Sequence, residues 1–126
     1  MTTGVLTRNR EPTLSLEVRG PDGAQSVEAI IDTGFNGALT LPSKQINALG
    51  LPAAGQEPVT MADGREITTS LYDAYVIIDE TAYKITVAEA PATPLLGTDL
   101  LWGFSLYVEF QAGGAVEVAR LSEGAE

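Results

Sequence analysis

The sequence predicts a mostly β fold, a small antiparallel barrel or sandwich with one or two short helices. Three observations support this prediction: short β-prone segments recur along the chain, Gly- and Pro-rich turns separate them, and helical signals are few. The 126 residues suit a single domain. We expect residues 1–12 and 122–126 to be flexible or interface tails of that domain, and residues 116–121 are a candidate interface strand.

The first predicted strands form a hairpin. Residues 14–18 alternate between apolar and polar side chains, which is typical of a half-buried strand. The sequence Gly-Pro-Asp-Gly at 20–23 is a strong turn signal, and residues 26–31 return as a second strand. A short β-prone segment over residues 38–41 ends before Pro42.

Two segments carry helical signals. Ser43 is expected to N-cap a short helix over residues 44–49, which the glycine after it ends. A second helix of one or two turns is expected to begin at Thr98 or Asp99 and to end near Gly103.

The other predicted elements are strands. The Asp-Gly dipeptide at 63–64 lies between two β-prone runs, which predicts a hairpin. The Gly-Gly dipeptide at 113–114 predicts another reversal. These remaining strands are expected over residues 57–61, 67–78, 81–88, 105–110 and 116–119.

Charge excludes some partners. Seventeen acidic and seven basic residues leave a net charge of −10, and no basic stripe is visible. Nucleic acids and anionic membranes bind clustered Lys and Arg, so we expect neither as a partner. No apolar run is long enough to cross a bilayer, and no apolar segment of a signal peptide follows the first basic residues.

The chain contains neither cysteine nor histidine. This composition excludes Ser-His-Asp and Cys-His catalysis, together with Cys- and His-ligated metal sites. We therefore expect no metal and no cofactor, and the lack of cysteine fits a cytoplasmic protein. Any chemistry must use carboxylates, Lys, Tyr, hydroxyl groups or the backbone.

The triplet Asp32-Thr33-Gly34 directly follows an apolar strand. Burying a lone carboxylate at such a place is costly, so Asp32 requires a reason. One interpretation is a turn that the Asp or Thr side chain caps. The other is the active-site loop of an aspartic peptidase.

Further motifs follow in a fixed order. After Ile30-Ile31-Asp32-Thr33-Gly34 come a hairpin tip, an apolar-apolar-glycine triplet and the expected second helix. On a β-rich chain this combination resembles the retropepsin-like aspartic peptidases, in particular their small single-domain prokaryotic members. The resemblance implies a small closed β-barrel, a flap tip and a triplet that braces the catalytic loop; the tip residues are Met61, Ala62, Asp63, Gly64 and Arg65, and the triplet is Leu95, Leu96 and Gly97.

The resemblance also implies roles. Peptide hydrolysis of this kind needs two carboxyl groups that share one proton. The chain has one such triplet, so the resemblance implies a homodimer in which two Asp32 side chains meet and cleave a peptide or protein substrate. Thr33 would hydrogen-bond across the dimer, and Gly34 would let the backbone approach the substrate.

One residue departs from the family pattern. The residue after the triplet is usually small but here is Phe35, and the small residue follows at Gly37. Phe35 either lines and narrows a pocket or packs in the core. Two alternatives to an active peptidase stay open: a weak or inactive dimerisation or peptide-binding module of the same fold, and an unrelated small barrel in which the triplet is only a turn.

Overall fold

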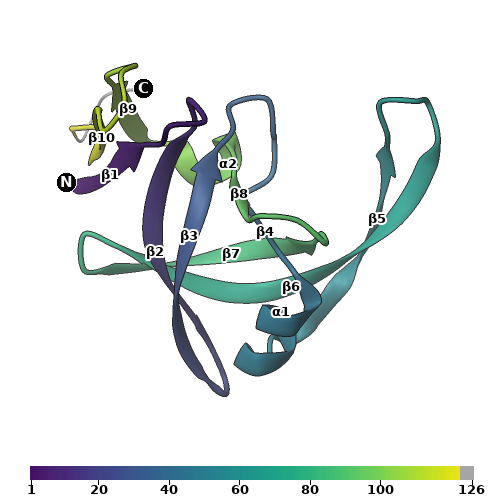
Figure 1. The fold of residues 1–126 in the computed structure, drawn as a ribbon. Coiled ribbons are helices and arrows are strands. Elements are labelled where there is room, and N and C mark those ends of the chain that lie inside the picture. The colour runs from purple at the N-terminus through teal and green to yellow at the C-terminus, as the bar shows by residue number, and fades with distance from the viewer. Residues whose placement is uncertain (123–126) are drawn as a thin grey trace.

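The computed structural model describes residues 1–122 (Figure 1), and within them the chain is mostly β, as predicted. The two helices are α1 (Ser43–Leu49) and α2 (Thr98–Leu101). The strands are β1 (Thr2–Leu6), β2 (Pro12–Gly20), β3 (Gly23–Ile31), β4 (Leu39–Leu41), β5 (Ala53–Thr60), β6 (Glu66–Ile78), β7 (Thr81–Glu89), β8 (Leu95–Leu96), β9 (Phe104–Val108) and β10 (Ala115–Arg120).

The strands join in one sheet that closes on itself. Their order is β5-β6-β7-β4-β8-β3-β2-β1-β10-β9, and an additional pairing between β6 and β2 completes a ring from β2 through β3, β8, β4 and β7 to β6. The β3–β8 and β4–β7 pairs are parallel, and the other pairs are antiparallel. The β5–β6 hairpin projects from one side of the ring, and β1, β10 and β9 extend the opposite side (Figure 1).

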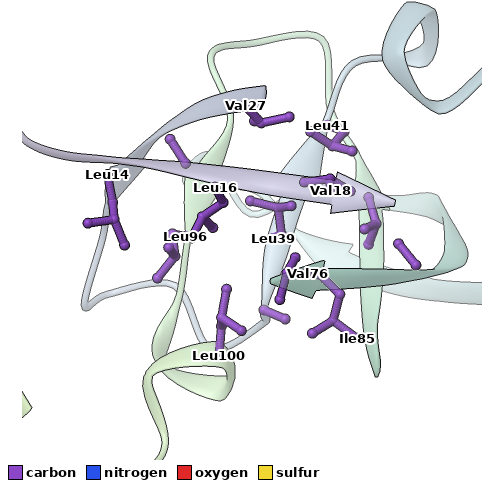
Figure 2. Close-up of a cluster of buried hydrophobic side chains, with 14 of the residues drawn as sticks. Leu14, Leu16, Val18, Val27, Leu39, Leu41, Val76, Ile85, Leu96 and Leu100 are labelled. Carbon is purple, nitrogen blue, oxygen red and sulfur yellow. The ribbon is translucent and has the colours of Figure 1, made fainter. Parts of the chain in front are cut away.

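Alternation along β2 and β3 places their apolar side chains in the core, as the pattern at 14–18 predicts. Leu16 lies opposite Val27 in the antiparallel register, and both side chains are buried. Figure 2 shows them facing residues from the short strands, among them Leu39 and Leu96, which are fully buried. Each such side chain stabilises the fold by about 1.5–3 kcal/mol through the surface that it removes from water.

The predicted cap of the first helix is wrong. Ser43 is already helical, and Pro42 occupies the N-cap position, where its carbonyl oxygen accepts the amides of Gln45 and Ile46 at 3.1 and 3.2 Å. The C-terminal prediction is confirmed, because Gly50 adopts the left-handed conformation with φ of 64°.

The second helix also lacks a side-chain cap. Gly97 holds its N-cap position, and Thr98 is its first helical residue. The Thr98 hydroxyl donates instead to the carbonyl oxygen of Phe35 at 3.3 Å. Neither Thr98 nor Asp99 therefore caps the helix.

The N-terminal segment is not a flexible tail over residues 2–6. These residues form β1, which pairs with β10 on one side and with β2 on the other. β2 then begins at Pro12. Residues 123–126 of the expected C-terminal tail lie outside the described residues.

We predict that Leu41→Ala destabilises the protein by about 2–5 kcal/mol, because the side chain is fully buried and its removal leaves a cavity. The exposed Ile67→Ala on β6 serves as the control and should change stability by less than about 0.5 kcal/mol. Urea unfolding followed by circular dichroism measures both. Equal midpoints for the two variants would contradict this assignment of the core.

Candidate active site

Asp32 follows the last residue of β3 and lies half-buried in a tight turn. Its Oδ1 accepts the amide N–H of Gly34 at 2.9 Å, and its carbonyl oxygen accepts the amide of Phe35 at 3.1 Å. Thr33 and Gly34 are exposed. The carboxylate is thus oriented by its own turn while it remains partly open to solvent, so the capped-turn interpretation describes the local geometry correctly.

The triplet at 95–97 lies directly beside this turn. β8 runs parallel to the end of β3, with Leu95 opposite Ile30 and Leu96 opposite Ile31. The amide of Asp32 continues this ladder by donating to the carbonyl oxygen of Leu96 at 2.9 Å. Residues distant in sequence therefore fix the backbone that carries the carboxylate.

Gly97 is required because two backbone segments meet at it. A Cβ at this position would lie 2.2 Å from the carbonyl oxygen of Gly37 and 2.5 Å from that of Phe35, and no side chain fits at those distances. The amide of Gly97 donates to Ala38 at 3.0 Å, and the amide of Thr98 donates to Phe35 at 2.9 Å. These bonds tie the far side of the Asp32 loop to α2.

Phe35 occupies space that two glycines leave for it. A Cβ on Gly37 would lie 2.5 Å from its ring, and one on Gly97 would lie 2.6 Å from it. The side chain is half-buried and also lines a pocket. Of the two roles weighed for Phe35, the structure supports the pocket wall: part of the ring packs against backbone, and Phe35 does not belong to the buried hydrophobic core.

That pocket lies between the Asp32 loop and the β5–β6 hairpin and has a volume of about 460 Å³. Most of its wall is apolar, and the carboxylates of Glu57 and Asp99 are also part of the lining. The sequence did not indicate that β5 contributes to it. The lining residues are Phe35, Asn36, Gly37, Ala38, Leu39, Glu57, Pro58, Val59, Leu71, Thr86, Ala88 and Asp99.

The predicted hairpin tip is a compact turn at the end of β5 and β6. The amide of Met61 donates to Arg65 at 2.7 Å, and the amide of Gly64 donates back to Met61 at 2.9 Å. Asp63 accepts the backbone amide of Arg65 at 3.0 Å and its guanidinium at 2.7 Å, and these two bonds lower the pKa of the Asp63 carboxyl. The tip, with Ala62, is exposed and does not line the pocket.

A second groove also has a volume of about 460 Å³, and unlike the first pocket it includes Asp32 in its lining. Asp32 and Thr33 line it together with Leu106, Val108 and Phe110. The alternation over residues 105–110 predicts that these three apolar side chains share a face. It carries no signal that this face lies beside the carboxylate.

Within residues 1–122, no group of three or more acidic side chains is arranged to hold a metal ion. No helix in this part of the chain has the length and apolar character to cross a membrane.

Several solved structures resemble this one, and two of them are described here, whereas no protein-family model and no curated protein matches the chain. The first is the EIAV protease in complex with the inhibitor HBY-793, at 16% identity and a TM-score of 0.61, covering 75% of this chain and 88% of that one. The second is a retropepsin-like aspartic protease from Rickettsia conorii, at 16% identity and a TM-score of 0.55, covering 95% and 92%. These likenesses overturn the alternative of an unrelated small barrel: the chain has a retropepsin-like fold.

Proposed function

We propose that the protein is an aspartic endopeptidase that acts as a homodimer, with one Asp32 from each chain. The observation that carries the proposal is the placement of Asp32 in a braced turn of a retropepsin-like fold, where Asp32 lines one groove and Phe35 of the same loop lines another pocket. Both structural neighbours are described as proteases. We propose that the chain is a single domain of this fold and that its compartment is the cytoplasm, because the chain has no cysteine.

The chemistry explains why a second copy is needed. One carboxylate removes a proton from water, the resulting hydroxide equivalent adds to the peptide carbonyl carbon, and a carboxylic acid protonates the carbonyl oxygen. The tetrahedral intermediate then breaks at its C–N bond, and the leaving nitrogen takes up a proton. The five other aspartates of the chain occur outside an Asp-Thr-Gly triplet, so the second carboxyl group comes from the partner's Asp32.

The other residues of the loop support this pair. Thr33 is exposed next to Asp32, which leaves its hydroxyl available to the partner's loop. Gly34 presents backbone without a side chain, so an extended peptide can approach closely. The loop is braced by its backbone contacts with the triplet, namely the β3–β8 pairing and the hydrogen bonds made by Leu96 and Gly97.

An extended peptide suits the substrate site. A chain lying between the Asp32 loop and the β5–β6 hairpin can form strand-like hydrogen bonds and place a side chain in the pocket beside Phe35. The residues Met61, Ala62, Asp63, Gly64 and Arg65 then act as the flap tip that covers it. The reaction uses no metal and no cofactor.

We predict that wild-type protein cleaves members of a diverse peptide mixture between about pH 3 and 8, with a maximum in acid, because the mechanism needs one protonated and one ionised carboxyl group. Asp32→Asn should lower kcat by at least about 100-fold, since it removes the acid–base pair. Asp73→Asn, on β6 and away from both grooves, is the matched control and should retain activity. Mass spectrometry of the products gives both rates.

Two outcomes would contradict this proposal. Undiminished cleavage by Asp32→Asn would exclude the mechanism. Absence of cleavage at every pH by folded, dimeric wild type would instead favour a peptide-binding module of the same fold.

We predict that Asp63→Ala loosens the hairpin tip. Because the pKa of Asp63 is lowered, its carboxylate stays ionised at neutral pH, and its bonds to Arg65 are lost only as pH falls through that lowered pKa. Amide hydrogen exchange over residues 61–65 should be several-fold faster in Asp63→Ala than in wild type at neutral pH. The difference should shrink in acid, and the nearby Glu66→Ala should exchange like wild type; a difference that is constant with pH would refute the role of Asp63.

We predict that Phe35→Leu changes which peptides are cleaved. Removing the ring widens the pocket, so kcat/KM for peptides with a bulky apolar side chain should rise relative to those with a small one by about 10-fold. Phe104→Leu removes an aromatic ring that packs against Tyr83 outside the pocket, and should leave this ratio unchanged. An unaltered ratio in Phe35→Leu would mean that the pocket does not select the substrate.

A further inference from the structure

We propose that Asn36 is a site of spontaneous deamidation, at which the folded protein releases ammonia and converts this residue to aspartate and isoaspartate. The site lies in the loop that carries Asp32. This inference goes beyond the proposed function and does not depend on it, because the reaction takes place between the chain and water without any substrate.

The residue that follows Asn36 makes the site reactive. Deamidation begins when the amide nitrogen of the next residue attacks the side-chain carbonyl carbon of asparagine, and a side chain on that next residue hinders the approach. Glycine has no side chain, so an Asn-Gly pair reacts readily. The chain contains two other asparagines, Asn9 and Asn47, which precede Arg10 and Ala48. Asn36 alone precedes a glycine.

The fold leaves both reacting groups open. Asn36 is exposed and belongs to neither a helix nor a strand. Within residues 1–122, the hydrogen bonds of the structure include none from the amide of Gly37 and none to or from the Asn36 carboxamide. The carboxamide therefore breaks no bond within the protein when it turns toward the Gly37 nitrogen.

The packing of Phe35 keeps glycine at position 37. A Cβ on residue 37 would lie 2.5 Å from the Phe35 ring, and a Cβ on Gly97 would lie 2.6 Å from it. The ring thus occupies the space that a side chain at either position would need. The arrangement that accommodates Phe35 after the Asp-Thr-Gly triplet therefore also places an Asn-Gly pair in the loop.

The reaction requires water alone as co-reactant. The Gly37 amide nitrogen loses its proton and forms a bond with Cγ of Asn36, and the Cγ–Nδ2 bond breaks as ammonia leaves with a proton, which closes a succinimide ring. Water then adds to one of the two ring carbonyl carbons, and the bond from that carbon to the Gly37 nitrogen breaks. Attack at Cγ gives aspartate, whereas attack at the main-chain carbon gives isoaspartate.

Isoaspartate lengthens a backbone that is held on both sides. Three hydrogen bonds join the loop to the start of α2: the amides of residues 97, 98 and 99 donate to the carbonyl oxygens of residues 38, 35 and 37, at 3.0, 2.9 and 3.2 Å. In isoaspartate the main chain runs through Cβ and Cγ, which adds one carbon between residues 36 and 37. The three bonds cannot all keep their lengths, so the loop loosens from α2.

Peptide mapping tests the site. Folded wild type is incubated in mildly alkaline buffer, where the amide nitrogen deprotonates more readily, and samples are digested with trypsin; a zero-time sample corrects for conversion during digestion. Cleavage after Lys and Arg places Asn36 in peptide 20–44 and Asn47 in peptide 45–65. Asn47 is exposed as well, so it is the matched internal control. Fragment masses locate the replacement of NH2 by OH, and chromatography separates the isoaspartyl peptide from the aspartyl peptide.

We expect Asn36 to convert at least about 10-fold faster than Asn47, because the glycine amide is unhindered. Isoaspartate should be the larger product. Asn36→Gln should show no measurable conversion at residue 36, since its longer side chain would have to close a larger ring. If Asn36 converts no faster than Asn47 in protein whose circular dichroism spectrum stays native, the proposal is wrong.

Amide hydrogen exchange tests the structural consequence. The amides of residues 97–99 should exchange several-fold faster in converted wild type than in fresh wild type, because their acceptors have moved. Fresh Asn36→Asp carries the new charge without the added carbon, and together with incubated Asn36→Gln it should exchange like fresh wild type. Exchange in Asn36→Asp as fast as in converted wild type would assign the loosening to charge and overturn the backbone argument, as would unchanged exchange in fully converted protein.

Neither measurement uses cleavage of a peptide. Failure of the peptidase assay would therefore leave both results standing, and an unreactive Asn36 would leave the peptidase proposal to its own assay.

Discussion

The hydrogen bond from the amide of Asp32 to the carbonyl oxygen of Leu96 is the contact on which the rest of the site depends. It extends the parallel β3–β8 pairing by one residue beyond the strand, so the turn begins at a fixed point. Loop closure over more than 60 residues opposes this contact, and the buried core around Leu96 offsets that entropy. Fold stability and carboxylate position therefore have the same source.

The fixed position of the Asp32 turn also determines how the Phe35 side chain can pack. The loop must return close to Gly97, where two backbone carbonyl oxygens exclude any side chain. A ring at position 35 is possible only because Gly37 and Gly97 both leave space for it. The large Phe35 and the small Gly37 therefore depend on each other for space. The Phe35 ring also narrows the pocket beside β5.

The sequence predicted correctly those features that depend on residues close together in the chain. Alternation placed Leu16 and Val27 in the core, and the Asp-Gly dipeptide located the β5–β6 turn. The sequence failed where distant segments decide the outcome. Residues 2–6 have no clear alternation and become β1 only because β2 and β10 pair with them. The nearness of β9 to Asp32 likewise results from the tertiary arrangement and from no motif.

Within the described residues, the sheet ends at β9, which lies beside Asp32, the residue that we propose to be catalytic. An edge of this kind exposes backbone donors and acceptors to water, and a half-buried carboxylate without its partner has no acid to work with. If one contact satisfies both needs, binding and catalysis are thermodynamically linked. Stability, dimer population and cleavage rate must then fall together on dilution, because association contributes free energy only to the folded state. Under the proposed mechanism, a change that weakens association of the two copies would act on catalysis through the population of dimer, without moving an atom of Asp32 within the single chain.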